Sequence, residues 1–365
     1  AAAATTAVQN AGMTGSADLI ELLPKIVEGA QGSLSDMGLS SSETIKVIQV
    51  VVFSMTKSLS GRDAYLPSAS SASGSTALET ALSKVAETSI GKLDEAGLST
   101  SDIATASSAL VGTLVGSLDD GGLQVSELSG AVEKITSGAT GALGNVNGIS
   151  VSDLAGVVEG ITSGATGALD DISISGYDSS KLSTLVEKVT SGATSALGNI
   201  EMTGYDASDL TGMMEKVTAG ATAALGSIEM TGYSSDNLSA MVSQVTAGAT
   251  SALSNIQMAG FSSDNISNIT INITISTTNS LSNITMIGFN PDNISSDITN
   301  SVSSGASVGM TNLQSTSSAP LITSVSSSTP NGKYNAGKNI FVSLNFNKPV
   351  NVDNSSGSPT IILET

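Results

Sequence analysis

One unit of this chain is the stretch Asp209-Leu-Thr-Gly-Met-Met-Glu-Lys-Val-Thr-Ala-Gly-Ala-Thr-Ala-Ala-Leu225. Apolar residues recur in it at steps of three or four, a spacing that places them on one stripe of an α-helix. The opposite face is taken by the polar residues Glu215, Lys216, Thr218 and Thr222. The stretch therefore predicts an amphipathic helix that buries its stripe against a neighbour. The stripe consists of Leu210, Met214, Val217, Ala221, Leu225 and Ile228.

A short motif, Ile-x-x-x-Gly followed by Tyr or Phe, comes after the later units at a constant step in residue number. A fixed period in this range is typical of stacked repeat proteins, in which each unit buries its apolar face only against its neighbours. The motif favours an elongated array built for display, spanning or assembly. Its five copies are Ile172–Tyr177, Ile200–Tyr205, Ile228–Tyr233, Ile256–Phe261 and Ile284–Phe289.

The same unit can be followed upstream through the leucine that closes each helix, such as Leu34, Leu143 and Leu225. The steps between these closing leucines are slightly shorter in the early units than in the later ones, and the step from Leu59 to Leu93 is longer than all others. About ten related units therefore extend from near residue 20 to about residue 300. A serine followed three residues later by a carboxylate, as in Ser150 and Asp153, predicts where helices start. If the Ile-x-Met segments stack as parallel strands, the array becomes a curved β/α solenoid.

Glycine recurs inside the helices, always in the tripeptide Gly-Ala-Thr. A glycine in mid-helix costs about 1 kcal/mol relative to alanine. Repetition of that cost in phase with the units predicts a close approach of helix backbones that a larger side chain would prevent. The five positions are Gly138, Gly164, Gly192, Gly220 and Gly248.

An aromatic residue closes each copy of the Ile-x-x-x-Gly motif. Such a ladder has two interpretations, a strip on which carbohydrate rings stack or a packed spine of the array. Its alternation with core aliphatic residues favours the packed spine. The ladder consists of Tyr177, Tyr205, Tyr233, Phe261 and Phe289.

Composition excludes several classes of function. The chain has 365 residues, with 13 Lys and Arg against 32 Asp and Glu, which gives a formal net charge of −19. No basic cluster is available to neutralise phosphates, which argues against nucleic acid as a partner. The chain contains no Cys and no His, so thiolate nucleophiles, disulfides and histidine general bases are excluded. No apolar run approaches the ~20 residues that a transmembrane helix needs.

Paired carboxylates at Asp119-Asp120 and Asp170-Asp171 directly follow closing leucines. A glycosidase needs two carboxylates that face each other across a cleft about 5–9.5 Å wide, which neighbours in sequence do not supply. We therefore expect solvated carboxylates, no enzyme activity and no cofactor. Calcium stays an alternative, because Asp119-Asp-Gly-Gly and Gly144-Asn-Val-Asn-Gly offer oxygen ligands, although neither fits the calcium loop with its closing Glu.

Residues 265–276 break the helical pattern, since Asn-Ile-Ser-Asn-Ile-Thr-Ile-Asn-Ile-Thr-Ile-Ser alternates polar and apolar residues. Alternation is the period of a strand with one buried face. We expect the array to change to strand here, where it would cap the solenoid or pair with a second chain. The region is also rich in Asn-x-Ser/Thr triplets, which are either glycosylation signals or chance matches in an Asn- and Ser-rich stretch.

The C-terminal segment contains Leu321-Ile-Thr-Ser-Val, Asn331-Gly-Lys-Tyr-Asn-Ala-Gly337, Pro349-Val350 and Ser358-Pro-Thr-Ile-Ile-Leu-Glu-Thr365. This pattern resembles the opening half of the immunoglobulin-like repeats of large bacterial surface and adhesin proteins. The resemblance covers about residues 321–365 and implies a β-sandwich module in a secreted, modular chain, without catalytic residues. A full module needs about 100 residues, so a longer chain or another subunit would supply the missing strands.

The predicted fold class is an α+β repeat protein. It comprises a helical or β/α solenoid of about ten units, each about 25–28 residues long, followed by a β-sandwich segment of the immunoglobulin type. The predicted regions are N-terminal helical units at 1–62, a Ser/Pro/Gly-rich linker at 63–77, the main solenoid array at 78–264, β-rich degenerate repeats at 265–310, a linker at 311–320 and a partial Ig-like β-module at 321–365.

These features predict a non-enzymatic structural subunit of a bacterial extracellular filament or a stalk-like surface adhesin, secreted or displayed at the cell surface. The expected partners are further copies of the chain, joined head-to-tail, and glycans of a host, a cell surface or a matrix. The alternative is a carbohydrate- or protein-binding solenoid module of a large secreted protein. Strand exchange between the incomplete C-terminal module and residues 265–276 is one route to a polymer.

Overall fold

The computed structural model describes residues 16–58, 72–120, 123–201, 204–206, 209–229, 233, 235–256, 263–284, 296–316, 322–327 and 342–346. The chain forms two compact units, residues 1–310 and residues 311–365. The predicted linker at 63–77 overlaps a helix that begins at Ala72, and the other residues of this linker lie outside the described part.

Most of the described chain is helical. The α-helices are α2 (Ser16–Gly32), α3 (Ser41–Ser58), α4 (Ala72–Gly91), α5 (Thr100–Gly116), α6 (Leu128–Gly141), α7 (Val151–Gly167), α8 (Ser179–Leu197), α9 (Asp209–Ala224), α10 (Ser235–Ser251), α11 (Ser263–Ser280) and α12 (Ser296–Thr316). Short 3₁₀ turns are η1 (Ser35–Met37), η3 (Ala142–Asn145), η4 (Ala168–Asp171), η5 (Leu225–Ser227), η6 (Ala252–Asn255) and η7 (Leu281–Asn283).

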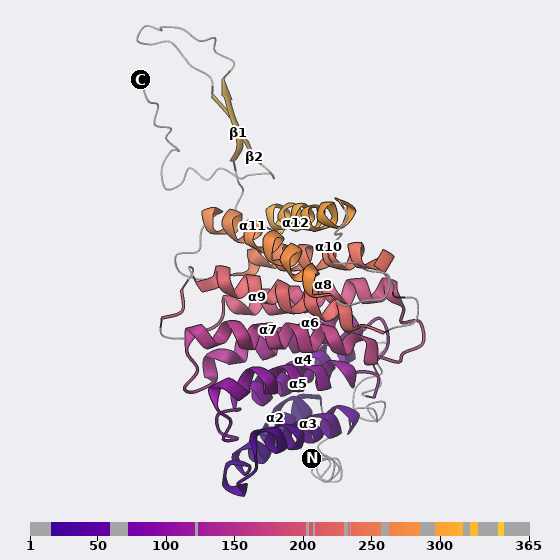
Figure 1. Cartoon of the computed structure of the whole chain (residues 1–365), viewed down its shortest axis with the longest axis vertical. Helices are drawn as coiled ribbons and strands as arrows, with labels where there is room; N and C mark the ends of the chain where they lie inside the picture. Colours follow the sequence, from indigo (N-terminus) through magenta and orange to yellow (C-terminus); the bar gives the residue numbers. More distant parts are fainter. Residues whose placement is uncertain are drawn as a thin grey trace. The chain divides into compact units, whose positions relative to one another are not determined.

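The helices stack in two layers (Figure 1). Each helix packs chiefly on the helix two positions along the chain, so α5 lies on α7 and α6 lies on α8. We call the layer of α2, α4, α6, α8, α10 and α12 the even layer, and that of α3, α5, α7, α9 and α11 the odd layer. The apolar stripes of both layers meet in one continuous core, in which the closing leucines such as Leu143 and Leu225 are fully buried.

Helix starts follow the predicted capping pattern. At the start of α7, the hydroxyl of Ser150 donates to the Asp153 carboxylate, which also accepts the N–H of Ser150 at 3.1 Å. These hydrogen bonds lower the pKa of Asp153. The bond from the Ser150 N–H occupies one of the backbone donors that a helix leaves unpaired at its start.

The prediction of strands between the helices is wrong, because in the described residues the segments after the closing leucines contain no strand. Ile172 is buried and extends the apolar stripe past η4. The backbone donors that follow find side chains instead of a neighbouring strand. The N–H of Ser173 donates to Asp119 Oδ2 at 3.1 Å, and the N–H of Glu229 donates to Asp170 Oδ2 at 2.9 Å.

The prediction of a strand at 265–276 is also wrong, because these residues lie in helix α11. Ile269 and Ile273 are four residues apart and fully buried, whereas Ile271 and Ile275 are more than half exposed. A run of alternating isoleucines contains both the strand period and the helix period. Contact with α9 selects the helix, because Ile269 and Ile273 stand at the core positions of the repeat.

The predicted β-sandwich of the immunoglobulin type is contradicted as well. Within residues 311–365, the described structure beyond the end of α12 is one antiparallel pair of strands, β1 (Ile322–Ser327) and β2 (Val342–Phe346). Their pairing is irregular between Ile322 and Ser324. A sandwich needs two packed sheets, and a single two-stranded pair cannot supply them. Strand exchange through 265–276 loses its basis too, because that segment is a helix.

Candidate functional site: the contacts that repeat along the stack

The Gly-Ala-Thr glycines lie where neighbouring helices of one layer meet. A Cβ added at Gly220 in α9 would lie 2.5 Å from the carbonyl oxygen of Glu159 and 2.5 Å from Oγ1 of Thr162, both in α7. Real Cβ atoms do not approach other atoms that closely, so glycine is required there. The other members of this glycine seam are Gly138 on Ser83, Gly164 on Ser108, Gly192 on Glu133, Gly248 on Glu187 and Gly305 on Ser243.

A buried threonine completes most of these contacts. Thr162 Oγ1 donates to the carbonyls of Val158 at 3.1 Å and Glu159 at 3.2 Å, so its hydroxyl is satisfied within its own helix. The helix two positions on can then pack against it at no hydrogen-bonding cost. The same pair of hydrogen bonds recurs at Thr136, Thr190, Thr218 and Thr246.

A second set of threonines, those of the Gly-Ala-Thr tripeptides, also lies in the core, so the prediction that Thr218 and Thr222 belong to the polar face is wrong. Their side chains are fully buried, and their hydroxyls have no hydrogen-bond partner in the described structure. Recurrence of the same buried hydroxyl in five helices was the signal that could have identified them. They are Thr140, Thr166, Thr194, Thr222 and Thr250.

Ion pairs cross the outer edge of the same contacts. Lys188 Nζ lies 3.0 Å from Glu133 Oε2, and Lys216 Nζ lies 2.8 Å from Glu159 Oε2. Each glutamate stands ten residues before its closing leucine and each lysine stands nine before its own. Because these side chains are partly exposed, each pair contributes at most about 1 kcal/mol. Both pairs show that helices two positions apart in the chain, α6 with α8 and α7 with α9, pack in the same register.

The paired carboxylates serve as ties between loops. Asp119 and Asp170 accept the backbone hydrogen bonds of Ser173 and Glu229 described above. Asp171 is exposed, but partial desolvation raises the pKa of its carboxyl, with the charges of Asp170 and Asp119 adding to the effect. Adjacent carboxylates that bind backbone N–H groups do not face each other across a substrate cleft.

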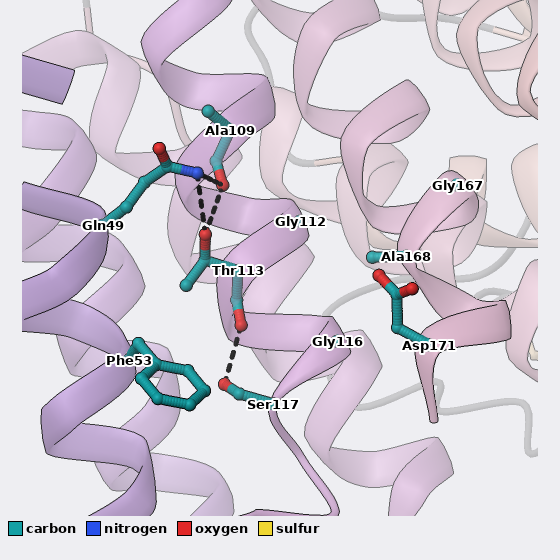
Figure 2. A pocket seen from close by; sticks show the side chains of 10 residues that line it. All are labelled: Gln49, Phe53, Ala109, Gly112, Thr113, Gly116, Ser117, Gly167, Ala168 and Asp171. Carbon is teal, nitrogen blue, oxygen red and sulfur yellow. Dashed lines mark hydrogen bonds between the residues drawn. The ribbon is translucent and has the colours of Figure 1, made fainter. Parts of the chain in front are cut away.

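A hollow of about 430 Å³ lies on the odd layer (Figure 2). Gly112 and Gly116 of α5 form its floor, and Gln49 and Phe53 of α3 stand on one side. Asp171 stands on the other side, from the turn that follows α7. The arrangement combines a partly exposed aromatic ring with an amide and a carboxylate.

Hydrogen bonds hold the α3 wall of this hollow in place. Gln49 Nε2 donates to Thr113 Oγ1 at 3.0 Å and to the Ala109 carbonyl at 3.3 Å. Lys57 Nζ lies 5.7 Å from the centre of the Phe53 ring, within the range of a cation–π contact. One face of the ring is therefore near a cation, and the hollow is open to solvent.

The tyrosines of the aromatic ladder are partly buried in the loops. Tyr177 donates its hydroxyl hydrogen to the carbonyl of Leu169 at 2.9 Å. The hydroxyls of Tyr205 and Tyr233 are buried and have no partner in the described structure. Phe261 and Phe289 lie outside the described residues. The described members therefore present little free ring surface to a sugar.

Alkaline pH is expected to destabilise the fold through these tyrosines. Burial raises the pKa of Tyr177, Tyr205 and Tyr233 above the ordinary value of about 10. The unfolded chain then loses phenolic protons at a pH where the folded chain keeps them, so stability falls as pH rises above about 10. Urea midpoints between pH 8 and 11 should fall steeply. A variant with all three changed to phenylalanine should show a flatter profile; an equally steep one would contradict this cause.

Among the described residues, no group of three or more acidic, His or Cys side chains is placed to hold a metal ion. Asp94 Oδ2 accepts a hydrogen bond from the Asn147 amide at 2.8 Å, and Asp119 is engaged as above. The calcium alternative therefore stays untested. None of the described helices has the length and apolar character that a membrane crossing needs.

Comparison with known proteins gives no relative on which to base a function, since no family model matches the chain and no curated protein is similar to it.

Proposed function

We propose that this protein is a non-enzymatic structural subunit of an extracellular filament or stalk-like surface adhesin, assembling head-to-tail. The observation that carries the proposal is the constancy of one helix contact along the stack. A glycine meets a backbone carbonyl in the same register where α6 to α10 and α12 pack on the helix two positions before them. In α11, Ser276 stands at this position and donates to the Glu215 carbonyl at 2.8 Å. A contact that recurs in one register builds length, and each added unit needs only its neighbours.

The surface supports a location outside the cell. A formal net charge of −19 without cysteine fits a chain that stays soluble at high local concentration and needs no reducing environment. The repeated Ser and Thr residues give hydroxyls for contact with glycans of a host, a cell surface or a matrix. These partners belong to the proposal, as does secretion.

A second candidate function is a carbohydrate- or protein-binding module. The hollow on the odd layer favours it, because the Phe53 ring lies beside the Gln49 amide and across from the Asp171 carboxylate. Aromatic faces with adjacent hydrogen-bonding groups are suited to sugar rings.

Electron microscopy of the purified full chain in negative stain separates the two candidates. A filament subunit is expected to form linear polymers whose number rises with protein concentration. Discrete particles at every concentration, with retention on an immobilised glycan, would contradict the filament proposal and favour the binding module.

A further inference from the structure

The N-terminal end of the even layer carries an unused copy of the packing glycine. Gly29 of α2 stands five residues before the closing leucine Leu34, as Gly220 stands five before Leu225. Gly29 is exposed, and a Cβ added there would meet nothing within 4 Å. Helix α2 therefore exposes the glycine surface with which later helices of the layer pack on the helix two positions before them.

The last helix of the same layer, α12, carries the surface that could receive such a glycine. Helix α12 packs on α10 through Gly305, and Thr246 Oγ1 donates to the Val302 carbonyl at 3.1 Å. This contact fixes the register of α12 against the repeat. Asn300 and Ser303 are then the counterparts of Ser243 and Thr246, whose carbonyl and hydroxyl receive Gly305. Both Asn300 and Ser303 are exposed.

We infer that α12 of one copy binds α2 of a second copy, with Gly29 seated on the Asn300 carbonyl beside Ser303. The inference rests on the proposed function and names the joint of the polymer. The contact is head-to-tail, because the two surfaces differ, and it does not close on itself. A stack extended in this way repeats across the joint the contact that already holds its interior together.

Exposed apolar side chains are confined to the two ends of the stack. Among the described residues, the exposed large hydrophobic side chains all lie in α3, α11, α12 or the turn η1, and none lies from α4 to α10. Single exposed apolar residues are ordinary, but their restriction to both ends is a feature of interaction surfaces. They are Met37, Val47, Val50, Phe53, Ile271, Ile275 and Val308.

The odd layer contributes apolar surface to the joint. The described stack begins and ends with a helix of the even layer. When α2 of a second copy packs on α12 in register, the odd layer is therefore left with a gap one helix wide, between α11 of one copy and α3 of the next. The exposed Ile271 and Ile275 belong to the first of these helices, and Val47 and Val50 to the second. Closing the joint removes apolar surface from water.

Charge opposes this contact only weakly. From residue 265 to residue 316 the charged side chains are Asp292 and Asp297 alone, in a chain whose net charge is −19. On α2, Asp18, Glu21 and Glu28 stand against Lys25, which pairs with Glu21 at 2.6 Å, so this helix keeps a net charge of −2. Because the α12 end carries so little charge, repulsion across the joint is weaker than repulsion between the acidic sides of two copies.

The substitution Gly29→Leu tests the joint with the full-length chain. In a single copy the leucine enters open space, so the melting temperature should equal that of the parent or exceed it. At the joint the leucine would strike the α12 backbone, so sedimentation should show association at least tenfold weaker. Gly156→Leu is the matched control, because Gly156 is an exposed helix glycine of α7 with nothing within 4 Å. It should leave association unchanged and should not lower the melting temperature.

A mixing experiment tests polarity. Ser303→Glu places bulk and charge on the seat at the other end, so this variant and Gly29→Leu should each stay monomeric alone. In an equal mixture, the intact α12 surface of the Gly29→Leu variant can still bind the intact α2 surface of the Ser303→Glu variant. The mixture should therefore form dimers that grow no further. Deleting residues 321–365 should leave association of the parent chain intact.

Three outcomes would overturn the inference. Polymers that survive both substitutions would place the joint elsewhere while leaving the proposed function standing. A fall in melting temperature without loss of association would mean that residues of the same chain cover Gly29. A parent chain that stays monomeric at every concentration would remove the inference and the filament function together.

Discussion

Replacing Gly220 with leucine is expected to destabilise the stack by about 3 kcal/mol or more, because the new side chain must displace a backbone carbonyl. An added Cβ alone would already lie 2.5 Å from the Glu159 oxygen. That oxygen belongs to the α7 helix and cannot rotate away as a flexible side chain could. For a unit of this size the melting temperature should fall by about 5 °C or more in differential scanning calorimetry.

Gly212 provides the control for this experiment within the same helix. A Cβ added at Gly212 meets nothing within 4 Å, and the residue is exposed. Gly212→Leu should therefore be neutral or stabilise by up to about 1 kcal/mol, since glycine is a poor helix former. Equal melting temperatures for the two variants would contradict the assignment of Gly220 to a close backbone contact.

Replacing Ile273 with alanine is expected to cost about 2–5 kcal/mol, because the side chain is fully buried in the core of the stack and its removal leaves a cavity. Ile271→Ala should change the free energy of unfolding by less than about 0.5 kcal/mol, because surface substitutions seldom do more. Chemical unfolding curves measure both. The contrast between them depends on α11 being a helix.

The two isoleucines separate helix from strand because they are two residues apart. In a strand they would share one face and the two substitutions would have similar effects. In a helix they lie on different faces, and their exposed fractions in the structure are 57% for Ile271 and 0% for Ile273. Similar losses for both variants would restore the strand interpretation of residues 265–276.

Local patterns predicted the helices of the array well. Steps of three or four in the apolar residues and the Ser150–Asp153 pattern depend only on the geometry of one helix. The recurrence of the Gly-Ala-Thr glycines at one position of each unit also predicted a close contact between helices. A residue that lowers helix stability in every unit needs a compensating reason. The structure places those glycines at backbone carbonyls of neighbouring helices.

Other features were not accessible to the sequence. The constant step between copies of the motif defines a unit but does not say that successive units alternate between layers, so the partner of Gly220 could not be named. The Ile172–Tyr177 segment has the composition of a strand, yet the Asp119 carboxylate takes the N–H of Ser173, a donor that a strand would need. Such a tie joins groups that are far apart in sequence and is invisible to local patterns. The isoleucines of α11 fit two periods, and only packing decides between them.

The most direct test of this account is a cryo-electron microscopy map of the assembled full-length protein. The account predicts a polymer in which both helix layers continue across the joint between copies, with α2 of one copy seated on α12 of the next through Gly29. A joint built from paired strands of residues 321–365, or an assembly in which the ends of the stack stay free and copies touch along their sides, would contradict it.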